Sequence, residues 1–219
     1  LLNPASVVEW NTDKRYLRDL DAAGVPIVPT EFLEPGADVD AWSPPSGYAD
    51  FVVKPAVSAG SRDTMRYAVD GPLDDARAHV QRLLDDGRTV MVQPYLDAVD
   101  TEGETALLFL GGAFSHAIRK GPLLVRGVEG ERVEGLFVQE QIDPREPTDD
   151  QHAVARAVVA AIPGGLHAVL YARVDLIPGP DGRPQLLELE LTEPSLFLSH
   201  SAGAPTRLAQ AIAARLATA

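Results

Sequence analysis

The stretch VDLIPGPDGRPQLLELEL, residues 174–191, has a pattern that predicts a β-hairpin with acidic side chains on one face. Asp181-Gly182 is a favoured two-residue hairpin turn. A turn centred there places Asp175 opposite Glu188, and leucine and valine side chains occupy the other face. A slip of one residue would bury the acids, so the alternation fixes this register, provided that the proline-rich loop stays symmetric.

The charged face of this hairpin also pairs Arg173 with Glu190. Directly opposed carboxylates repel each other, so Asp175 and Glu188 need a compensating cation. Arg173 can neutralise one acid. The remaining oxygen ligands, with no cysteine or histidine beside them, suit a hard ion such as Mg²⁺. The alternative interpretation is the solvated outer face of an edge hairpin.

Composition excludes several classes of protein. The chain has 219 residues, 45% of them hydrophobic, which is enough to bury a core in one large domain or two lobes. A net charge of -13 repels phosphate backbones and anionic lipid, so nucleic acid and membranes are not expected partners. The chain has no cysteine and no apolar run of about 18 residues, so we expect a cytoplasmic protein without disulfides or a membrane span.

Periodicity and turn residues predict an α/β chain of the α+β kind, with lobes at residues 1–96 and 97–219. The first lobe is expected to begin with a helix capped at Asn11 or Thr12. The chain begins at Leu1 rather than at methionine, and we therefore expect an upstream segment.

A second hairpin is predicted about Gly111-Gly112, within the stretch GETALLFLGGAFSHAIRK. A two-residue turn there places Glu104 opposite Arg119, so an ion pair is one interpretation of Glu104. The same register places His116 opposite Leu107, which indicates a packed or surface histidine rather than a catalyst.

The segment FVVKPAVSAGS combines a strand with a loop of small residues. Lys54 at the end of the strand supplies a point charge for phosphate. The small residues Ser58, Gly60 and Ser61 let backbone N–H groups approach phosphate oxygens. The spacing of a Walker loop is absent, so a flexible surface turn is the alternative. A later strand, VMVQPYL, is broken at Pro94 and exposes backbone groups suited to a planar base.

The order of these elements resembles the ATP-grasp superfamily, in particular its glutathione-synthetase-like members. The resemblance rests on the lysine of NTDK, the VVKPAVSAGS loop, the QPYL strand end, the GETALL strand, and the R-x-D and E-x-E strands. The chain looks most like actinobacterial ATP-grasp ligases of the kind that includes the cyclo-ligase of cycloserine biosynthesis. The resemblance covers essentially the whole chain and implies two lobes that clasp ATP, without the N-terminal domain that usually precedes them.

The resemblance implies a nucleotide site between the lobes. Lys14 and Lys54 would contact the ATP phosphates, beneath a flap formed by the small residues Ser58, Gly60 and Ser61. The hinge would meet the adenine through the backbone that runs through Gln93, Tyr95 and Leu96. Glu104 would bind the ribose, unless it pairs with Arg119 as the hairpin register suggests.

The resemblance also implies a metal site and catalytic cations. Asp175 and Glu188 would hold Mg²⁺ against the phosphates, and Glu190 stands where many members of the family carry asparagine. Arg173 would stabilise the transferred phosphoryl group or the oxyanion. Lys120 would reach the γ-phosphate or the acyl-phosphate.

The implied activity is an ATP- and Mg²⁺-dependent ligase that joins a small amino-acid-like carboxylate to an amine through an acyl-phosphate. Small-molecule substrates and a homodimer are the expected partners. Two alternatives are an ATP-binding fragment without turnover and a small-molecule kinase on the same scaffold. His200 follows the acidic hairpin, on a loop that either borders the acceptor site or has a structural role.

Overall fold

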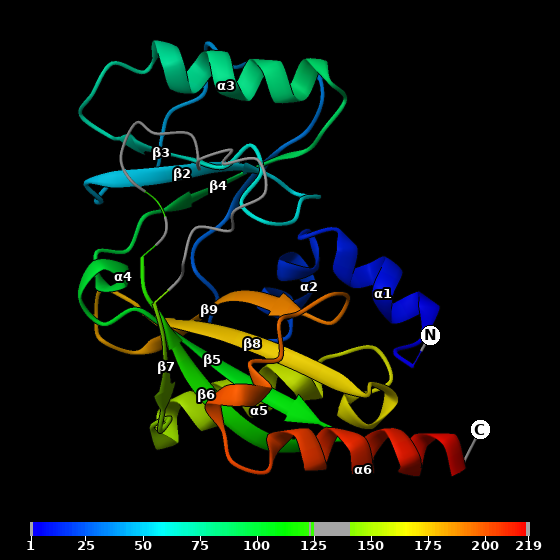
Figure 1. Cartoon of the computed structure of the whole chain (residues 1–219). Helices are drawn as coiled ribbons and strands as arrows, with labels where there is room; N and C mark the ends of the chain where they lie inside the picture. The colour runs from blue at the N-terminus through cyan, green and yellow to red at the C-terminus, as the bar shows by residue number, and fades with distance from the viewer. Residues whose placement is uncertain (1, 123, 125–140, 218–219) are drawn as a thin grey trace.

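The computed structural model describes residues 2–122, 124 and 141–217, and it contains two antiparallel sheets. One sheet lies above the other in Figure 1, and the chain crosses between them beside the short helix α4 (Ala98–Thr101). This architecture confirms the predicted α+β class. None of the helices in the described ranges is both long enough and apolar enough to cross a membrane.

The first sheet has four strands in the order β1-β4-β2-β3. The strands are β1 (Glu31–Leu33), β2 (Asp50–Pro55), β3 (Met65–Ala68) and β4 (Val90–Pro94). Helix α3 (Asp74–Asp85) covers one face of this sheet and closes a core around Phe51, Val80 and Leu83. The other face looks toward the second sheet (Figure 1).

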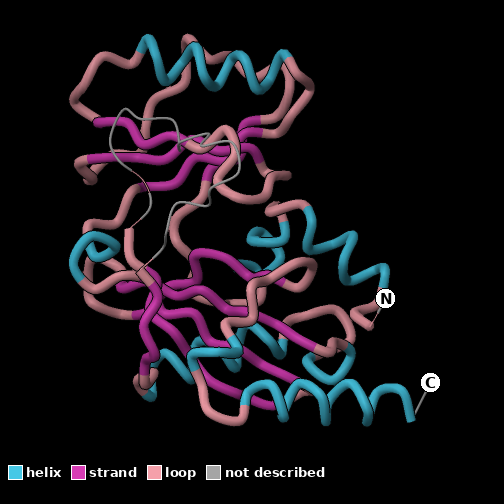
Figure 2. Tube along the Cα trace, viewed as in Figure 1, coloured by secondary structure: helices cyan, strands magenta, loops and turns pink. Residues whose placement is uncertain are grey.

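The second sheet has five strands in the order β7-β6-β5-β8-β9. The strands are β5 (Glu104–Leu110), β6 (Ala113–Lys120), β7 (Ile142–Arg145), β8 (Tyr171–Pro178) and β9 (Pro184–Glu190). Helix α5 (Asp149–Ala160) packs beneath β8 and β9, and α6 (Ala204–Ala217) passes beside the β5–β6 turn (Figures 1 and 2). Short 3₁₀ turns occupy Leu166–Ala168 and Leu198–His200.

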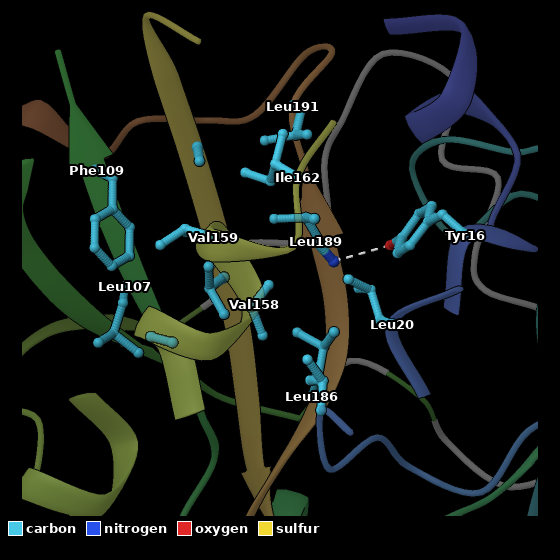
Figure 3. Close-up of a cluster of buried hydrophobic side chains, with 14 of the residues drawn as sticks. Tyr16, Leu20, Leu107, Phe109, Val158, Val159, Ile162, Leu186, Leu189 and Leu191 are labelled. Carbon is cyan, nitrogen blue, oxygen red and sulfur yellow. Dashed lines mark hydrogen bonds between the residues drawn. The ribbon is translucent and has the colours of Figure 1, made fainter. Parts of the chain in front are cut away.

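The core of the second sheet includes the first two helices of the chain, α1 (Ala5–Thr12) and α2 (Tyr16–Ala22). Side chains that meet in this core are drawn in Figure 3 and include Tyr16, Leu20, Val158, Leu186 and Leu189. The division of the chain into residues 1–96 and 97–219 stays a prediction. The packing of α1 and α2 against the second sheet is a contact that sequence order does not suggest.

The start of the chain differs from the prediction. A helix that begins at Asn11 or Thr12 is wrong, because α1 ends at Thr12 and α2 follows after a short turn. Asn11 instead contacts the backbone of β9 and the residue after it. Its Nδ2 donates to the Leu189 carbonyl at 2.8 Å, and its Oδ1 accepts from the Leu191 N–H at 2.7 Å. Lys14 therefore lies in the turn between α1 and α2, and not within a helix.

Strand β9 lies at the edge of its sheet, and the first residues of the chain supply partners for its outer backbone. The Tyr16 hydroxyl accepts from the Leu189 N–H at 2.9 Å (Figure 3). The Leu186 N–H donates to the Pro26 carbonyl at 2.8 Å, and the Leu186 carbonyl accepts from the Val28 N–H at 2.9 Å. Edge groups without such partners invite unwanted strand pairing. The strand that carries Glu188 is thus fixed by the N-terminal segment.

The acidic hairpin has the predicted register where its charged side chains lie. The charged pairs are Arg173 with Glu190 and Asp175 with Glu188. Nearer the tip the pairing shifts by one residue, so Leu176 lies opposite Leu186, whereas a turn centred on Asp181-Gly182 would place it opposite Leu187. The final pair is Pro178 with Pro184, so the loop is longer than a two-residue turn. The bulge next to Asp175 absorbs this difference and leaves the charged face in register.

The β5–β6 hairpin follows the predicted register only beside its turn. A bulge next to Leu108 shifts all the pairs farther from the turn by one residue. Glu104 therefore lies opposite Lys120, and the predicted pairing with Arg119 is wrong. His116 lies opposite Leu108 rather than the preceding leucine. A bulge inserts one unpaired residue, and no glycine or proline in this strand marks where it occurs.

The contacts of Asn11 generate a test of the fold. Replacing Asn11 by leucine, which has a similar volume, leaves the Leu189 carbonyl and the Leu191 N–H without these partners inside the protein. Since each of the two buried unsatisfied groups costs roughly 1–3 kcal/mol, we expect the free energy of unfolding to fall by about 2–6 kcal/mol in urea titrations. Thr12→Ala, at the adjacent exposed position, is the control and should change it by less than about 0.5 kcal/mol. Equal stability of Asn11→Leu and the control would contradict this account.

Candidate functional site

The carboxylates of the acidic hairpin gather at one point on the face of the second sheet that looks toward the first. Asp175, Glu188 and Glu190 each offer a carboxylate oxygen, and these atoms all lie within 4.8 Å of one another. Asp175 is fully buried, whereas Glu188 and Glu190 are partly exposed. The predicted solvated outer face is therefore wrong for Asp175.

The sheet register builds the site from two neighbouring rows of side chains that run across the strands. One row contains Ala106, Asp175 and Glu188, and the other contains Leu108, Arg173 and Glu190. The β5 members of these rows, Ala106 and Leu108, are uncharged and belong to a small apolar cluster. Alternation along each strand thus brings acids from β8 and β9 together without any special loop.

Three cations hold the acids. Lys120 Nζ donates to Asp175 Oδ2 at 2.7 Å and also lies 2.7 Å from Glu104 Oε2. Arg173 Nε donates to Asp175 Oδ1 at 2.9 Å, and the same guanidinium pairs with Glu190. Lys14 Nζ lies 3.2 Å from Glu188 Oε1, and it donates to the Ser58 carbonyl at 2.9 Å. The third cation, Lys14, thus comes from the turn between α1 and α2.

These contacts set the protonation of the acids. Burial would raise the pKa of Asp175, but the charges of Arg173 and Lys120 hold that pKa below its ordinary value. Burial likewise opposes ionisation of Glu188, and Lys14 and Lys54 overcome it and lower the pKa. Burial raises the pKa of Glu190 to about 7, because Arg173 only partly offsets it and the neighbouring acids add to it. Two ionised acids and one with a raised pKa face the same point.

Lys54 lies near the end of β2, in the first sheet, and brings a fourth cation to the site. Burial lowers the pKa of its ammonium, and the charges of Glu188 and Glu104 oppose this shift. Lys54 lies two residues from Val52 on β2, so it shares the strand face that packs toward the second sheet. The strand-end lysine predicted from the sequence thus points toward the sheet that carries the metal candidates, and the charges of Lys14 and Lys120 also act on it.

The loop after β2 carries the predicted flap residues Ser58, Gly60 and Ser61. Its backbone is tied to the site, because the Ser58 carbonyl accepts from Lys14 and the Ala56 carbonyl accepts from the Lys14 N–H at 2.9 Å. Ser61 and Asp63 adopt positive φ values of 54° and 55°, which residues other than glycine rarely do. Asp63 is held by Arg88 at 2.7 Å. Contact of this loop with phosphate stays a prediction.

The predicted hinge residues Gln93, Tyr95 and Leu96 lie where the chain leaves the first sheet. The Gln93 side chain is occupied, since its Nε2 donates to Thr30 Oγ1 at 2.9 Å. The Tyr95 hydroxyl donates to Asp100 Oδ1 at 2.6 Å, and Arg66 stacks 3.4 Å above the Tyr95 ring. Leu96 is buried in an apolar cluster. A pocket of about 270 Å³ opens next to Tyr95 and Leu96, away from the acids.

The apolar cluster at the hinge joins the two sheets and was not predicted from the sequence. It includes Val52 of β2, Leu96 of the hinge and Ile177 of β8, with Leu187 of β9 packed against it. A signal was present, since period-two alternation from Asp175 places Ile177 on the same face of β8. Apolar residues on a strand are so common, however, that they do not identify a ligand wall.

The donor set fits Mg²⁺. Three carboxylates with oxygen atoms this close, and with no cysteine or histidine among them, match the ligand preference of a hard divalent cation. Each lysine ammonium has three donors, and in the described residues Lys14 and Lys120 each use two of them on the protein. The site thus offers oxygen ligands for a cation next to ammonium donors for anionic oxygens.

Comparison with known proteins identifies the fold family. No family model matches the sequence. The chain is 41% identical over 227 residues to the cycloserine biosynthesis protein DcsG from Streptomyces lavendulae, covering 99% of this chain and 73% of DcsG. The crystal structure of the D-cycloserine synthetase DcsG gives a TM-score of 0.85 at 41% identity, over 99% of this chain and 74% of that one.

More distant structures share the architecture. A D-alanine–D-alanine ligase from Bacillus anthracis complexed with ATP gives a TM-score of 0.63 at 17% identity, over 95% of this chain and 68% of the ligase. The ATP-grasp ligase PsnB, complexed with Mg and ADP, gives a TM-score of 0.64 at 20% identity, over 98% of this chain and 61% of PsnB in one such structure. These two likenesses show the fold alone. With the much nearer relationship to DcsG, they establish that the chain belongs to the ATP-grasp ligase family.

Proposed function

We propose that this protein is an ATP- and Mg²⁺-dependent ligase that activates a small amino-acid-like carboxylate as an acyl-phosphate and joins it to an amine. The observation that carries this proposal is the cluster of Asp175, Glu188 and Glu190 beside the cations of both sheets. The relationship to DcsG, whose crystal structure is described as that of a D-cycloserine synthetase, supports it.

The nucleotide would lie between the two sheets. We assign the triphosphate to Lys14 and Lys54, and the loop of Ser58, Gly60 and Ser61 would close over it. The adenine would occupy the apolar cluster at the hinge, against the backbone that runs through Gln93, Tyr95 and Leu96. Glu104 stays a candidate for the ribose, although it also holds Lys120. Small residues in the loop favour close approach of backbone N–H groups to phosphate.

The metal would be held by Asp175, Glu188 and Glu190. When bound, Mg²⁺ supplies positive charge that neutralises the phosphate oxygens. Lys14 and Lys120 would share their carboxylate partners with the metal and direct their remaining donors toward phosphate. Removing a carboxylate from this cluster would therefore weaken the metal site and also leave a cation without its partner.

The proposed ligation proceeds in two steps. A carboxylate oxygen of the substrate attacks the γ-phosphorus, the bond to ADP breaks, and an acyl-phosphate forms. An amine then attacks the carbonyl carbon, phosphate leaves, and the nitrogen loses a proton. Arg173 and Lys120 are the catalytic candidates, because they lie beside the acids where negative charge must accumulate. Closure of the small-residue loop would exclude the water that destroys an acyl-phosphate.

The identity of the amine separates two versions of this reaction. A ring-closing ligase takes the amine from the same molecule as the carboxylate, and D-cycloserine, which DcsG is described as synthesising, has such a C–N bond in its ring. We favour this version because 41% identity extends over 99% of the chain. It stays a prediction that the protein acts in the cytoplasm and that it assembles as a homodimer.

Replacing Glu188 by glutamine tests the metal assignment. The change keeps the shape and removes the charge, so the affinity for Mg²⁺ in the presence of a non-hydrolysable ATP analogue should fall at least tenfold. Isothermal titration calorimetry of Mg²⁺ into the protein saturated with the analogue measures it. Glu146→Gln, at an exposed position outside the site, should bind as the wild type does. Wild-type affinity in Glu188→Gln would remove this residue from the metal site.

Replacing Lys54 by methionine tests the phosphate assignment. Charge-assisted hydrogen bonds contribute roughly 1.5–3 kcal/mol, so ATP affinity should fall about 10- to 150-fold. The melting temperature without nucleotide should hold or rise, because burial disfavours the charged form of this lysine. Arg156→Met, at an exposed position on α5, is the matched control. Unchanged ATP affinity in Lys54→Met would contradict the assignment.

Product analysis tests the function itself. ADP release should depend on a carboxylate substrate, which is sought in a panel of D- and L-amino acids. The panel includes the open-chain acid that corresponds to D-cycloserine with its ring C–N bond hydrolysed. A ligase releases ADP and phosphate together with an amide-like product. A kinase releases ADP with a phosphorylated product and no free phosphate. A binding protein releases neither ADP nor phosphate. Either of the last two results would overturn the proposed function.

A further inference from the structure

The segment that follows β9 contains a strained residue beside Arg173, one of the two catalytic candidates. Phe197 adopts φ 45° and ψ 39°, the left-handed region that bulky residues avoid. The Arg173 guanidinium lies 5.8 Å from the centroid of the Phe197 ring. Such backbone conformations cost free energy and persist only where surrounding contacts impose them. The contacts that impose this one are therefore informative.

Two neighbouring carbonyls just before Phe197 are each held by a side chain of the sheet. Arg173 donates to the Ser195 carbonyl at 3.4 Å, and His116 Nε2 lies 3.0 Å from the Leu196 carbonyl. His116 is buried, with 6% of its surface exposed. Leu196 and Phe197 also pack on a small apolar cluster of β5 and β6. The segment is thus fixed over Arg173 by one catalytic candidate and one histidine.

The direction of the hydrogen bonds around His116 follows from the groups at the two ends of the hydrogen-bond chain, Arg207 and the Leu196 carbonyl. Arg207 of α6 can only donate, and its Nε donates to Ser115 Oγ at 2.9 Å. The Leu196 carbonyl can only accept, so His116 Nε2 carries the proton and donates to it. In a neutral ring Nδ1 is then an acceptor, and the Ser115 hydroxyl, 2.9 Å away, donates to it. Burial lowers the pKa of His116, which favours this neutral form.

The register of the sheet places this histidine in line with the site. His116 lies opposite Leu108, Leu108 lies opposite Arg173, and Arg173 lies opposite Glu190. Along β6, His116 and Lys120 are an even number of residues apart, so both point to the face that carries the acids. No ATP-binding candidate contacts His116 in the described residues. A change at His116 should therefore affect the part of the site that lies away from the hinge.

We propose that His116 is a positioning residue that holds the 195–197 segment over Arg173 and thereby orients the carboxylate substrate. This inference rests on the proposed function, because it assigns the space beside Arg173 to the acid that is phosphorylated. The sequence predicts a packed or surface histidine at His116. The structure shows a packed ring. Its hydrogen bonds to Ser115 and to the Leu196 carbonyl give the imidazole a role that packing alone would not require.

Three variants separate positioning from general stability. His116→Phe keeps the ring volume and removes both hydrogen bonds, while His116→Gln keeps a donor near the Nε2 position. His152→Phe makes the same exchange at a histidine that packs on Phe114, outside the site. We expect His116→Phe to raise KM for the carboxylate about tenfold, the usual loss for a hydrogen bond of this kind, with KM for ATP within twofold. His116→Gln should recover most of the loss, and His152→Phe should behave as the wild type.

A second measurement makes the result independent of turnover. Hydrogen exchange followed by mass spectrometry should show faster exchange of residues 196–201 in His116→Phe, and wild-type exchange there in His116→Gln. Unchanged exchange, or KM values for ATP and carboxylate that rise together, would overturn the proposal. Absence of any carboxylate-dependent turnover in the wild type would instead overturn the proposed function, and the exchange data would still decide whether His116 holds the segment.

Discussion

The charged side chains of the site are arranged around the fully buried carboxylate of Asp175. A buried charge is costly unless it is paired and hydrogen-bonded, and here Lys120 and Arg173 both donate to it. The same two cations reach outward to Glu104 and Glu190. These five side chains therefore form one connected network, and its geometry follows from the register of β5, β6, β8 and β9.

The beginning of the chain completes this network from the other side. Asn11 and Tyr16 bind the backbone around Leu189, and they thereby fix the edge strand that carries Glu188. The same turn delivers Lys14, whose ammonium joins Glu188 to the loop after β2. Helices α1 and α2 therefore have two roles, because they cover a strand edge and they connect the metal candidates to the phosphate loop candidate.

The sequence supports the charged face of the acidic hairpin and the α+β class, because period-two alternation and turn chemistry are local properties. It does not reveal the bulges that shift the tip of that hairpin and the pairing of Glu104. It also misplaces Lys14, since the partners that take Asn11 away from a helix cap lie about 180 residues farther along the chain. The cluster of Val52 and Ile177 is missed because an apolar strand residue gives the same pattern whether it packs within one sheet's core or between two sheets.

An isotope label tests whether the site activates a carboxylate with ATP. The acid substrate is prepared with ¹⁸O in both carboxylate oxygens, and the phosphate released during turnover is analysed by mass spectrometry. If an acyl-phosphate forms, phosphate leaves with the oxygen that joined it to the carbonyl carbon, and each phosphate carries one ¹⁸O. Phosphate without label would show that ATP is cleaved without activating the carboxylate, and would contradict this account.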